Sequence, residues 1–400
     1  MKLTFLLYIG VCSWLFITFP TSTWAQTKSL SPSVHKKLEK AQAQIQAQEY
    51  QSALNAIQPL THSTRPNSLD RAMSWQLIAH VHVQLGTETR AIHAYEQALG
   101  QNALSKGDQK SLTLSLGQLY LNQQQPQKSI KLLNGWMETA AKQVDVNAYL
   151  LLAQAYSKSD EPSKAPFFVK QAIEHYGPDN ESWYQYLFGL YYDLGDHEQA
   201  VNVLRKMTAI FPSEKRYWQQ LASLYLSLKQ QDDALKTLQI AWQKDYLTNE
   251  KEITNLVALY EINHLPYEAA SVLEQALQHK KIKPTFEMWL KAINLFLAAQ
   301  EHEKALELID KARITTHLSE ELLILVQLYV ADEKWRLAQE LLSEASSALK
   351  SKSGKYYYLQ AVVSYHLGDI ENSILHFTKV SEHKLYGRDA KKWIDYLQAF

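Results

Sequence analysis

One residue pattern recurs ten times along this chain of 400 residues and constrains its fold more than any other feature. In each copy a small residue is followed three residues later by an aromatic or apolar one. Nine residues further comes Ala or Ser, then an apolar residue four positions on and usually Ala after three more. The Ala or Ser positions lie 33 to 38 residues apart, at Ala53, Ala91, Ser129, Ala165, Ala200, Ala234, Ala269, Ala305, Ala338 and Ser373. A period of this length predicts a solenoid of stacked structural units.

Each unit is expected to be a pair of antiparallel helices, with small residues where the two helices cross. One core position holds a tyrosine in six units: Tyr120, Tyr156, Tyr191, Tyr225, Tyr260 and Tyr329. Gly86, Gly195 and Gly368 come four residues after this core position, where Gly can adopt the left-handed conformation that ends a first helix. Asp196 and Asp369 follow two of these glycines and are expected to cap the second helices.

The layout resembles the tetratricopeptide repeat, whose units are helix pairs with this spacing of aromatic and small residues. The predicted fold class is therefore all-α: a superhelical solenoid of about ten helix pairs over residues 34–384, closed by a capping helix over residues 385–400. Only 12 Gly and 11 Pro occur, too few turn formers for a many-stranded fold. The first repeat carries Lys37, Lys40 and Gln44 at positions that are apolar elsewhere, which predicts a polar N-terminal end.

The N-terminus is typical of a secretory signal peptide. Lys2 precedes an apolar run over residues 3–19, and small residues lead up to Ala25. We expect a signal peptide over residues 1–25, cleaved after Ala25, then a polar lead over residues 26–33, and hence a periplasmic protein. The alternative is an uncleaved inner-membrane anchor facing the periplasm, because roughly 17 apolar residues are near the minimum that spans a bilayer.

Composition and motifs argue against several classes of function. The 41 basic and 41 acidic residues balance, with no basic stripe for nucleic acid or an anionic membrane. The only cysteine is Cys12, so the chain beyond it can form neither a disulfide nor a thiolate metal site. His80 and His82 are two residues apart, a spacing that separates their imidazoles on a helix. Without catalytic motifs or a phosphate loop, we expect no enzyme activity, cofactor, metal or small-molecule substrate.

The first helices of stacked pairs are expected to line a concave binding face. Counting along the repeats gives a lining of amides and apolar groups with few charges. The candidate residues of this protein-binding groove are Gln118, Gln154, Gln185, Tyr192, Gln219, Asn294 and Gln327. Amides can pair with the backbone of a bound segment without requiring a charge. Alternatively, glutamine is simply a good helix former on an exposed surface.

Two stretches also resemble a narrower family of exported tetratricopeptide proteins. They read F-P-x4-Y-W within residues 211–221 and L-P-Y-x-A-A within residues 265–274, and the resemblance is strongest over residues 183–310. That family is described as a component of TonB systems in gamma-proteobacteria. The resemblance implies a non-catalytic periplasmic scaffold that partners TonB, ExbB or ExbD in outer-membrane uptake of nutrients such as iron. The alternative is an exported scaffold for cell-wall or outer-membrane assembly.

Overall fold

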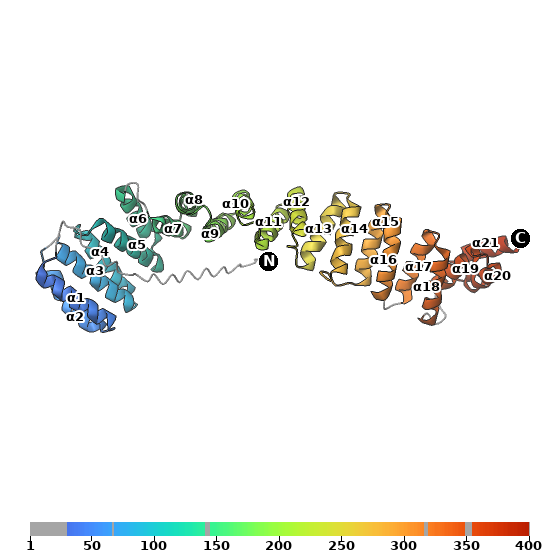
Figure 1. Ribbon diagram of the computed structural model, residues 1–400, viewed down its shortest axis with the longest axis horizontal. Coiled ribbons are helices and arrows are strands. Elements are labelled where there is room, and N and C mark those ends of the chain that lie inside the picture. Colours follow the sequence, from blue (N-terminus) through green and yellow to red (C-terminus); the bar gives the residue numbers. More distant parts are fainter. Residues whose placement is uncertain (1–29, 66–67, 141–144, 316–318, 349–353, 400) are drawn as a thin grey trace. The chain divides into compact units, whose positions relative to one another are not determined.

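The computed structural model describes residues 30–65, 68–140, 145–315, 319–348 and 354–399. Within these ranges every regular element is helical. The helices are α1 (Pro32–Gln46), α2 (Tyr50–Ser63), α3 (Leu69–Gln84), α4 (Glu88–Gly100), α5 (Lys106–Asn122), α6 (Pro126–Ala140), α7 (Val146–Ser157), the 3-10 turn η1 (Pro162–Lys164), α8 (Ala165–Tyr176), α9 (Glu181–Asp193), α10 (His197–Ile210), α11 (Lys215–Ser227), α12 (Gln231–Gln243), α13 (Glu250–Ile262), α14 (Pro266–Gln278), α15 (Phe286–Ala298), α16 (His302–Thr315), α17 (Ser319–Ala331), α18 (Trp335–Ala348), α19 (Gly354–His366), α20 (Ile370–Val380) and α21 (Gly387–Gln398). The predicted all-α repeat solenoid is confirmed (Figure 1).

The chain divides into two compact units, residues 1–194 with α1 to α9 and residues 195–400 with α10 to α21. Within each unit, every helix packs against its neighbours in sequence. Among the described residues, no helix has the length and apolar character needed to cross a membrane. The expected signal peptide over residues 1–25 lies outside the described residues, as do Phe400 and residues 26–29 of the polar lead.

Small residues sit where the two helices of a pair cross. The ten Ala or Ser residues that mark the period are each at most 1% exposed. Where serine replaces alanine, its hydroxyl is satisfied by the partner helix: Ser129 Oγ donates to the Gly117 carbonyl (3.0 Å), and Ser373 Oγ donates to the Ala361 carbonyl (2.9 Å). The same geometry in two distant repeats shows that the crossing is conserved along the solenoid.

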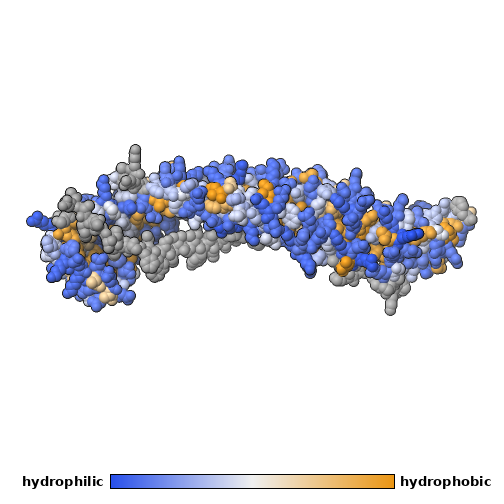
Figure 2. Space-filling model, in the orientation of Figure 1, coloured by the Kyte–Doolittle hydropathy of each residue, from blue (hydrophilic) through white to orange (hydrophobic). Residues whose placement is uncertain are grey.

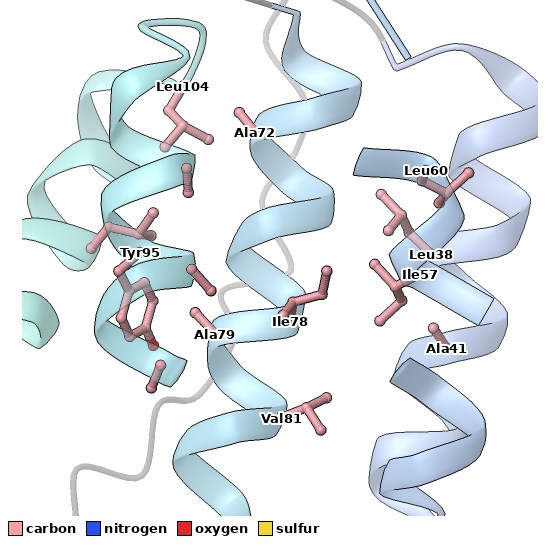
Figure 3. Packing of buried hydrophobic residues seen from close by; sticks show 14 of the residues in the cluster. Leu38, Ala41, Ile57, Leu60, Ala72, Ile78, Ala79, Val81, Tyr95 and Leu104 are labelled. Carbon is pink, nitrogen blue, oxygen red and sulfur yellow. The ribbon is translucent and has the colours of Figure 1, made fainter. Parts of the chain in front are cut away.

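Neighbouring pairs share one continuous core within the first three repeats. Figure 3 shows Ala79 on the side of α3 that faces Tyr95 of α4, whereas Ile78 and Val81 point the other way, toward Ile57 and the first pair. One helix therefore buries apolar side chains against both its partner and the preceding pair, as a solenoid requires.

The first repeat exposes two of the three polar residues that the sequence singled out, while the third, Gln44, is half-buried. Lys37 and Lys40 are exposed on α1, while Val34, Leu38 and Ala41 are buried against α2. The N-terminal end of the solenoid thus presents charge outward and keeps an apolar stripe inside.

The six core tyrosines are buried as expected, each between 4% and 7% exposed. The aromatic position near the start of the first helix is less regular. In α11 the fully buried ring is Tyr217, whereas Trp218 is half-buried and donates its Nε1–H to the Pro212 carbonyl (3.2 Å). Near the start of this first helix, Tyr217 rather than Trp218 therefore fills the core.

The turn between the two helices of a pair is one structure repeated with different residues. Gly86, Gly195 and Gly368 have positive φ, as predicted. The equivalent residue also has positive φ in six further repeats, where it is not glycine: Gln48, Gln124, Lys229, His264, Gln300 and Glu333. The N–H of the residue immediately before the second helix then bonds back to the first helix; for example, Gln230 N–H donates to the Tyr225 carbonyl (2.9 Å). This is the Schellman arrangement that satisfies a helix C-terminus.

Second helices begin with caps where Asp follows the glycine. Asp196 Oδ1 accepts from Gln199 N–H (3.2 Å) and Asp369 Oδ1 accepts from Asn372 N–H (3.1 Å), which confirms both predicted caps.

The last helix, α21, covers the final pair. Its Trp393 ring stacks on Phe377 of α20 with centroids 5.5 Å apart, and lies 5.0 Å from Tyr365 of α19. Ala390 and Leu397 complete this apolar cluster. These contacts give α21 the covering position that was predicted for the C-terminal helix.

Candidate functional site

In each unit, the first-helix face is the surface formed by the first helices of the pairs: the odd-numbered helices α1 to α9 in the first unit and α11 to α19 in the second. The seven candidate groove residues all lie on these helices and are at least partly exposed. In the first unit they are Gln118 on α5, Gln154 on α7, and Gln185 and Tyr192 on α9; in the second they are Gln219 on α11, Asn294 on α15 and Gln327 on α17. Figure 2 shows a mainly hydrophilic surface with small apolar patches, so no extended apolar area marks a site on the face it displays.

Two of the candidate glutamines in the first unit bond to a residue one turn away on their own helix. Gln118 Nε2 donates to Asn122 Oδ1 (3.0 Å), and Gln185 Nε2 donates to Glu181 Oε1 (3.3 Å). Such contacts between residues four apart stabilise a helix by a few tenths of a kcal/mol, about 0.2–0.5. They favour the helix-surface interpretation for these two amides.

Tyr192 lies at the surface with 52% of its side chain exposed. Its ring centroid is 5.9 Å from that of Phe188, one turn earlier on α9. The neighbouring Tyr191 is buried, so the two rings leave the helix in different directions. An exposed aromatic ring of this kind is a common anchor in protein interfaces.

Gln219 is hydrogen-bonded to the next repeat. Its Nε2 donates to the Tyr246 carbonyl and to Glu252 Oε2, both at 3.1 Å. Both acceptors belong to the next repeat, so this amide ties α11 to the start of α13. Sequence spacing could not reveal the bond, because one acceptor is a backbone carbonyl 27 residues away.

In the second unit the first-helix face contains a hollow of about 390 Å³ between α13 and α15. We call it the first-helix hollow; it is lined by Glu261, Glu287, Leu290, Lys291, Asn294 and Leu295. The candidate Asn294 is exposed here, and Leu290 lies one turn before it. Lys291 Nζ is 2.8 Å from Glu261 Oε2, which joins the two first helices across the hollow.

Three of these six lining residues are charged, more than the repeat pattern predicted. Glu287, Lys291 and Asn294 follow helical spacing on α15, so their shared side could be read from the sequence. Glu261 comes from the preceding repeat, 30 residues before its partner Lys291, and only the packing of α13 on α15 places it there. The hollow can offer hydrogen bonds from an amide and from an ion pair beside apolar leucine side chains.

The histidine pair of α3 has a structural role. His82 is buried in the core position, and its Nδ1 lies 2.9 Å from Thr87 Oγ1 in the following turn. Burial, with a contribution from Arg90, lowers the pKa of His82, and burial lowers that of His80. Both shifts favour the neutral imidazole. Across the residues that the structure describes, no cluster of three His, Cys, Asp or Glu side chains is placed to hold a metal ion.

Antiparallel helix pairs stacked with this period define an α-helical repeat solenoid, a class that presents binding surfaces rather than an enclosed active site. Two family models described as tetratricopeptide repeat match residues 174–345 and 77–144. Over these residues the chain consists of tetratricopeptide repeats. Repeats of this kind form protein–protein interaction scaffolds and are typically non-catalytic.

Several solved structures have some similarity to this chain. The Naa15/Naa10 complex bound to HypK-THB contains a chain 14% identical (91% of this chain, 64% of that chain, TM-score 0.42). MamA from Desulfovibrio magneticus is 17% identical (46% and 99%, TM-score 0.38), and a tetratricopeptide repeat protein from Parabacteroides merdae is 11% identical (73% and 99%, TM-score 0.31). No curated protein matches the sequence.

Proposed function

We propose that this protein is a non-catalytic periplasmic scaffold that serves a TonB–ExbB–ExbD energy-transduction system in outer-membrane uptake of nutrients such as iron. The repeat fold supports the scaffold role. The resemblance of residues 211–221 and 265–274 supports the choice of partner. The observation that carries the proposal is the first-helix hollow, which lies inside the stretch where that resemblance is strongest.

The residues that carry the resemblance join consecutive repeats around this hollow. The Pro212 carbonyl accepts from the Tyr246 hydroxyl (3.1 Å), which belongs to the next repeat. Tyr267 lies at the start of α14, and its hydroxyl accepts from Lys304 Nζ (2.7 Å) of the following repeat. The Tyr267 ring also packs edge-on against Phe296 of α15, with centroids 6.1 Å apart. These contacts join the loop before α11 to the loop before α13, and α14 to α15 and α16.

The periplasmic location rests on the sequence. The order of basic, apolar and small residues in positions 1–25 predicts export. Residues 26–400 contain no cysteine, so the mature chain folds without disulfide formation in an oxidising compartment. Mass spectrometry of the exported protein should find an N-terminus at Gln26. An intact Met1 in the membrane fraction would replace this location with an inner-membrane anchor.

Uptake and binding test the function. Asn294→Arg places a long cation in the first-helix hollow and should reduce co-purification with TonB, ExbB or ExbD, together with TonB-dependent iron uptake. Gln275→Arg is the matched control, because Gln275 is also an exposed amide but lies on the second helix α14. Both variants should keep the helix content of the parent chain.

Two results would contradict the proposal. Equal uptake with both variants would remove the hollow from the binding surface. Normal iron uptake in a deletion strain, grown where the TonB system is the sole route, would remove the TonB assignment itself and favour the cell-envelope assembly alternative.

A further inference from the structure

A second hollow, of about 480 Å³, lies in the first unit on the side of the second helices. We call it the second-helix hollow. It is formed by α4, α5 and α6 and lined by Leu99, Asn102, Gln109, Thr113, Tyr120, Lys128, Lys131, Leu132, Gly135 and Trp136. Half of the lining comes from one stripe of α6. From Lys128 to Trp136 this stripe spans eight residue steps, about 12 Å at the rise of an α-helix. That length matches three to four residues of extended chain, at about 3.3 Å each.

Lys128 occupies a repeat position at which two other repeats also carry a lysine. Its Nζ lies over the ring of the core Tyr120, 5.6 Å from the centroid. Lys164 and Lys304 lie in the same way over Tyr156 and Phe296, also eight residues earlier in the sequence.

The two equivalent lysines each have a carboxylate three residues earlier. Lys164 Nζ is 2.5 Å from Glu161, and Lys304 Nζ is 3.9 Å from Glu301. The corresponding residue before Lys128 is Gln125, a neutral amide. Lys128 therefore has the same placement as the other two lysines but lacks the carboxylate that pairs with each of them.

Lys131 adds a second cation one turn further along α6. Within the described part of the chain, no carboxylate lies within 4.0 Å of Lys128 or Lys131, whereas Lys110 is paired with Asp145 at 2.9 Å. The acid next to this hollow is Glu96 on α4, and its Oε1 accepts from the Tyr120 hydroxyl (2.5 Å). The hollow therefore presents two ammonium groups whose charge the protein does not balance by direct pairing.

Burial and the Glu96 carboxylate raise the pKa of Tyr120 well above its ordinary value. The phenol stays protonated and bonded to Glu96, so it serves this hollow as an aromatic wall beneath Lys128 rather than as an additional charge.

Trp136 supplies an apolar end to the hollow. It stands seven residues after Ser129, a position held by alanine in six other repeats: Ala98, Ala172, Ala241, Ala276, Ala312 and Ala345. The indole is half-buried, and the adjacent Gly135 has open space where a Cβ would stand. The Trp136 ring therefore forms one side of the hollow. The missing side chain at Gly135 leaves the hollow open next to that ring.

We propose that the second-helix hollow binds an acidic segment of a protein partner. Side-chain carboxylates of the segment pair with Lys128 and Lys131, and an apolar or aromatic side chain of the segment packs on Trp136. The two lysine cations favour an acidic segment through charge complementarity. The aromatic side chains beside them favour an apolar side chain in the same segment. The proposal rests on the scaffold part of the proposed function but uses a different surface and requires no TonB component.

Peptide binding to the full chain tests this proposal. The probe is a labelled nine-residue peptide of alternating Ser and Glu with a central Phe, compared with the same peptide carrying Gln for Glu. The parent chain should bind the Glu peptide at least about tenfold more tightly, and added salt should weaken binding. The double variant Lys128→Gln/Lys131→Gln should lose most of this preference. Lys164→Gln is the matched control and should retain it, because that lysine is already paired with Glu161.

A site-specific label locates the bound peptide. With Cys12→Ser in the background, Gly135→Cys gives a single thiol at the second-helix hollow and Gly189→Cys gives one on α9, at another glycine with open space. An environment-sensitive fluorophore at position 135 should respond to the Glu peptide, and one at position 189 should not.

Three outcomes would overturn the proposal. They are equal binding of the Glu and Gln peptides, unchanged binding by the double lysine variant with normal helix content, and a response at position 189 alone. Binding of free glutamate as tight as that of the peptide would reassign the hollow to a small anion, and binding only to phosphatidylglycerol vesicles would reassign it to a lipid surface. None of these results depends on iron uptake, so failure here is distinct from failure of the TonB proposal.

Discussion

Replacing the non-glycine residues of the inter-helix turns with glycine should stabilise the solenoid. We choose Lys229, His264 and Gln300, which join α11 to α12, α13 to α14 and α15 to α16. Their φ angles are 59°, 57° and 63°, and all three side chains are exposed. The substitutions therefore remove left-handed strain without removing a buried contact.

The size of the effect follows from two opposing terms. A left-handed conformation costs an L-residue roughly 1–2 kcal/mol. About 0.4–1 kcal/mol of this stabilisation is lost, because glycine raises the conformational entropy of the unfolded chain. The net stabilisation is about 0.5–1 kcal/mol at each turn, and about 2 kcal/mol for the triple variant, since the sites lie in separate repeats and should act independently.

Hydrogen exchange measured by mass spectrometry reads this effect turn by turn, because a solenoid unfolds in local steps. Amides near each substituted turn should exchange about two to five times more slowly, and the urea midpoint should rise. Asp160→Gly is the matched control. Asp160 stands at the equivalent position of the fourth repeat but lacks positive φ, and it accepts a hydrogen bond from Gln127 (3.1 Å). It should lower stability; a gain equal to that of the other sites would refute the reasoning.

Three further perturbations have defined outcomes. Tyr225→Ala removes a ring that is 7% exposed and should cost about 3–5 kcal/mol in urea unfolding. Gly117→Ala would place a Cβ 3.0 Å from a leucine methyl carbon and should destabilise, whereas Gly189→Ala, with open space, should gain up to about 1 kcal/mol of helix propensity. Burial alone would raise the pKa of Asp145, but Lys110 at 2.9 Å and a backbone N–H hold it below its ordinary value. Asp145→Asn should therefore destabilise most at neutral pH. The stability difference from the parent chain should shrink once the pH falls below the ordinary aspartate pKa of about 4, and it should vanish below the lower pKa of the folded state.

Each of these outcomes can fail in an informative way. A near-neutral Tyr225→Ala would mean that the repeat register is wrong, because the register places that ring in the core. Equal effects of alanine at Gly117 and Gly189 would mean that the tight helix crossing does not limit side-chain size. A stability difference at Asp145 that persists at low pH would attribute the effect to the side-chain shape rather than to its charge.

The candidate site was only partly readable from the sequence. Helical spacing placed Asn294 and Leu290 on one side of a first helix, and both line the first-helix hollow. The same spacing placed Gln219 on that face, but its amide bonds to the next repeat. Spacing within one helix says which way a residue faces, whereas its partners come from neighbouring repeats whose approach is set by packing. The charged lining contributed by Glu261 depends on that approach as well.

The sequence by itself determined the repeat unit, because burying an apolar face in stacked helix pairs demands small and aromatic residues at a regular period. Ten buried Ala or Ser residues and six buried tyrosines follow directly from that demand. The tertiary structure alone decided which turns adopt positive φ without glycine, since the hydrogen bonds of the closed turn impose a conformation that local preference would not choose. It alone decided, too, that Lys128 keeps an unbalanced charge: a residue's electrostatic surroundings come from side chains that meet only when neighbouring helices pack.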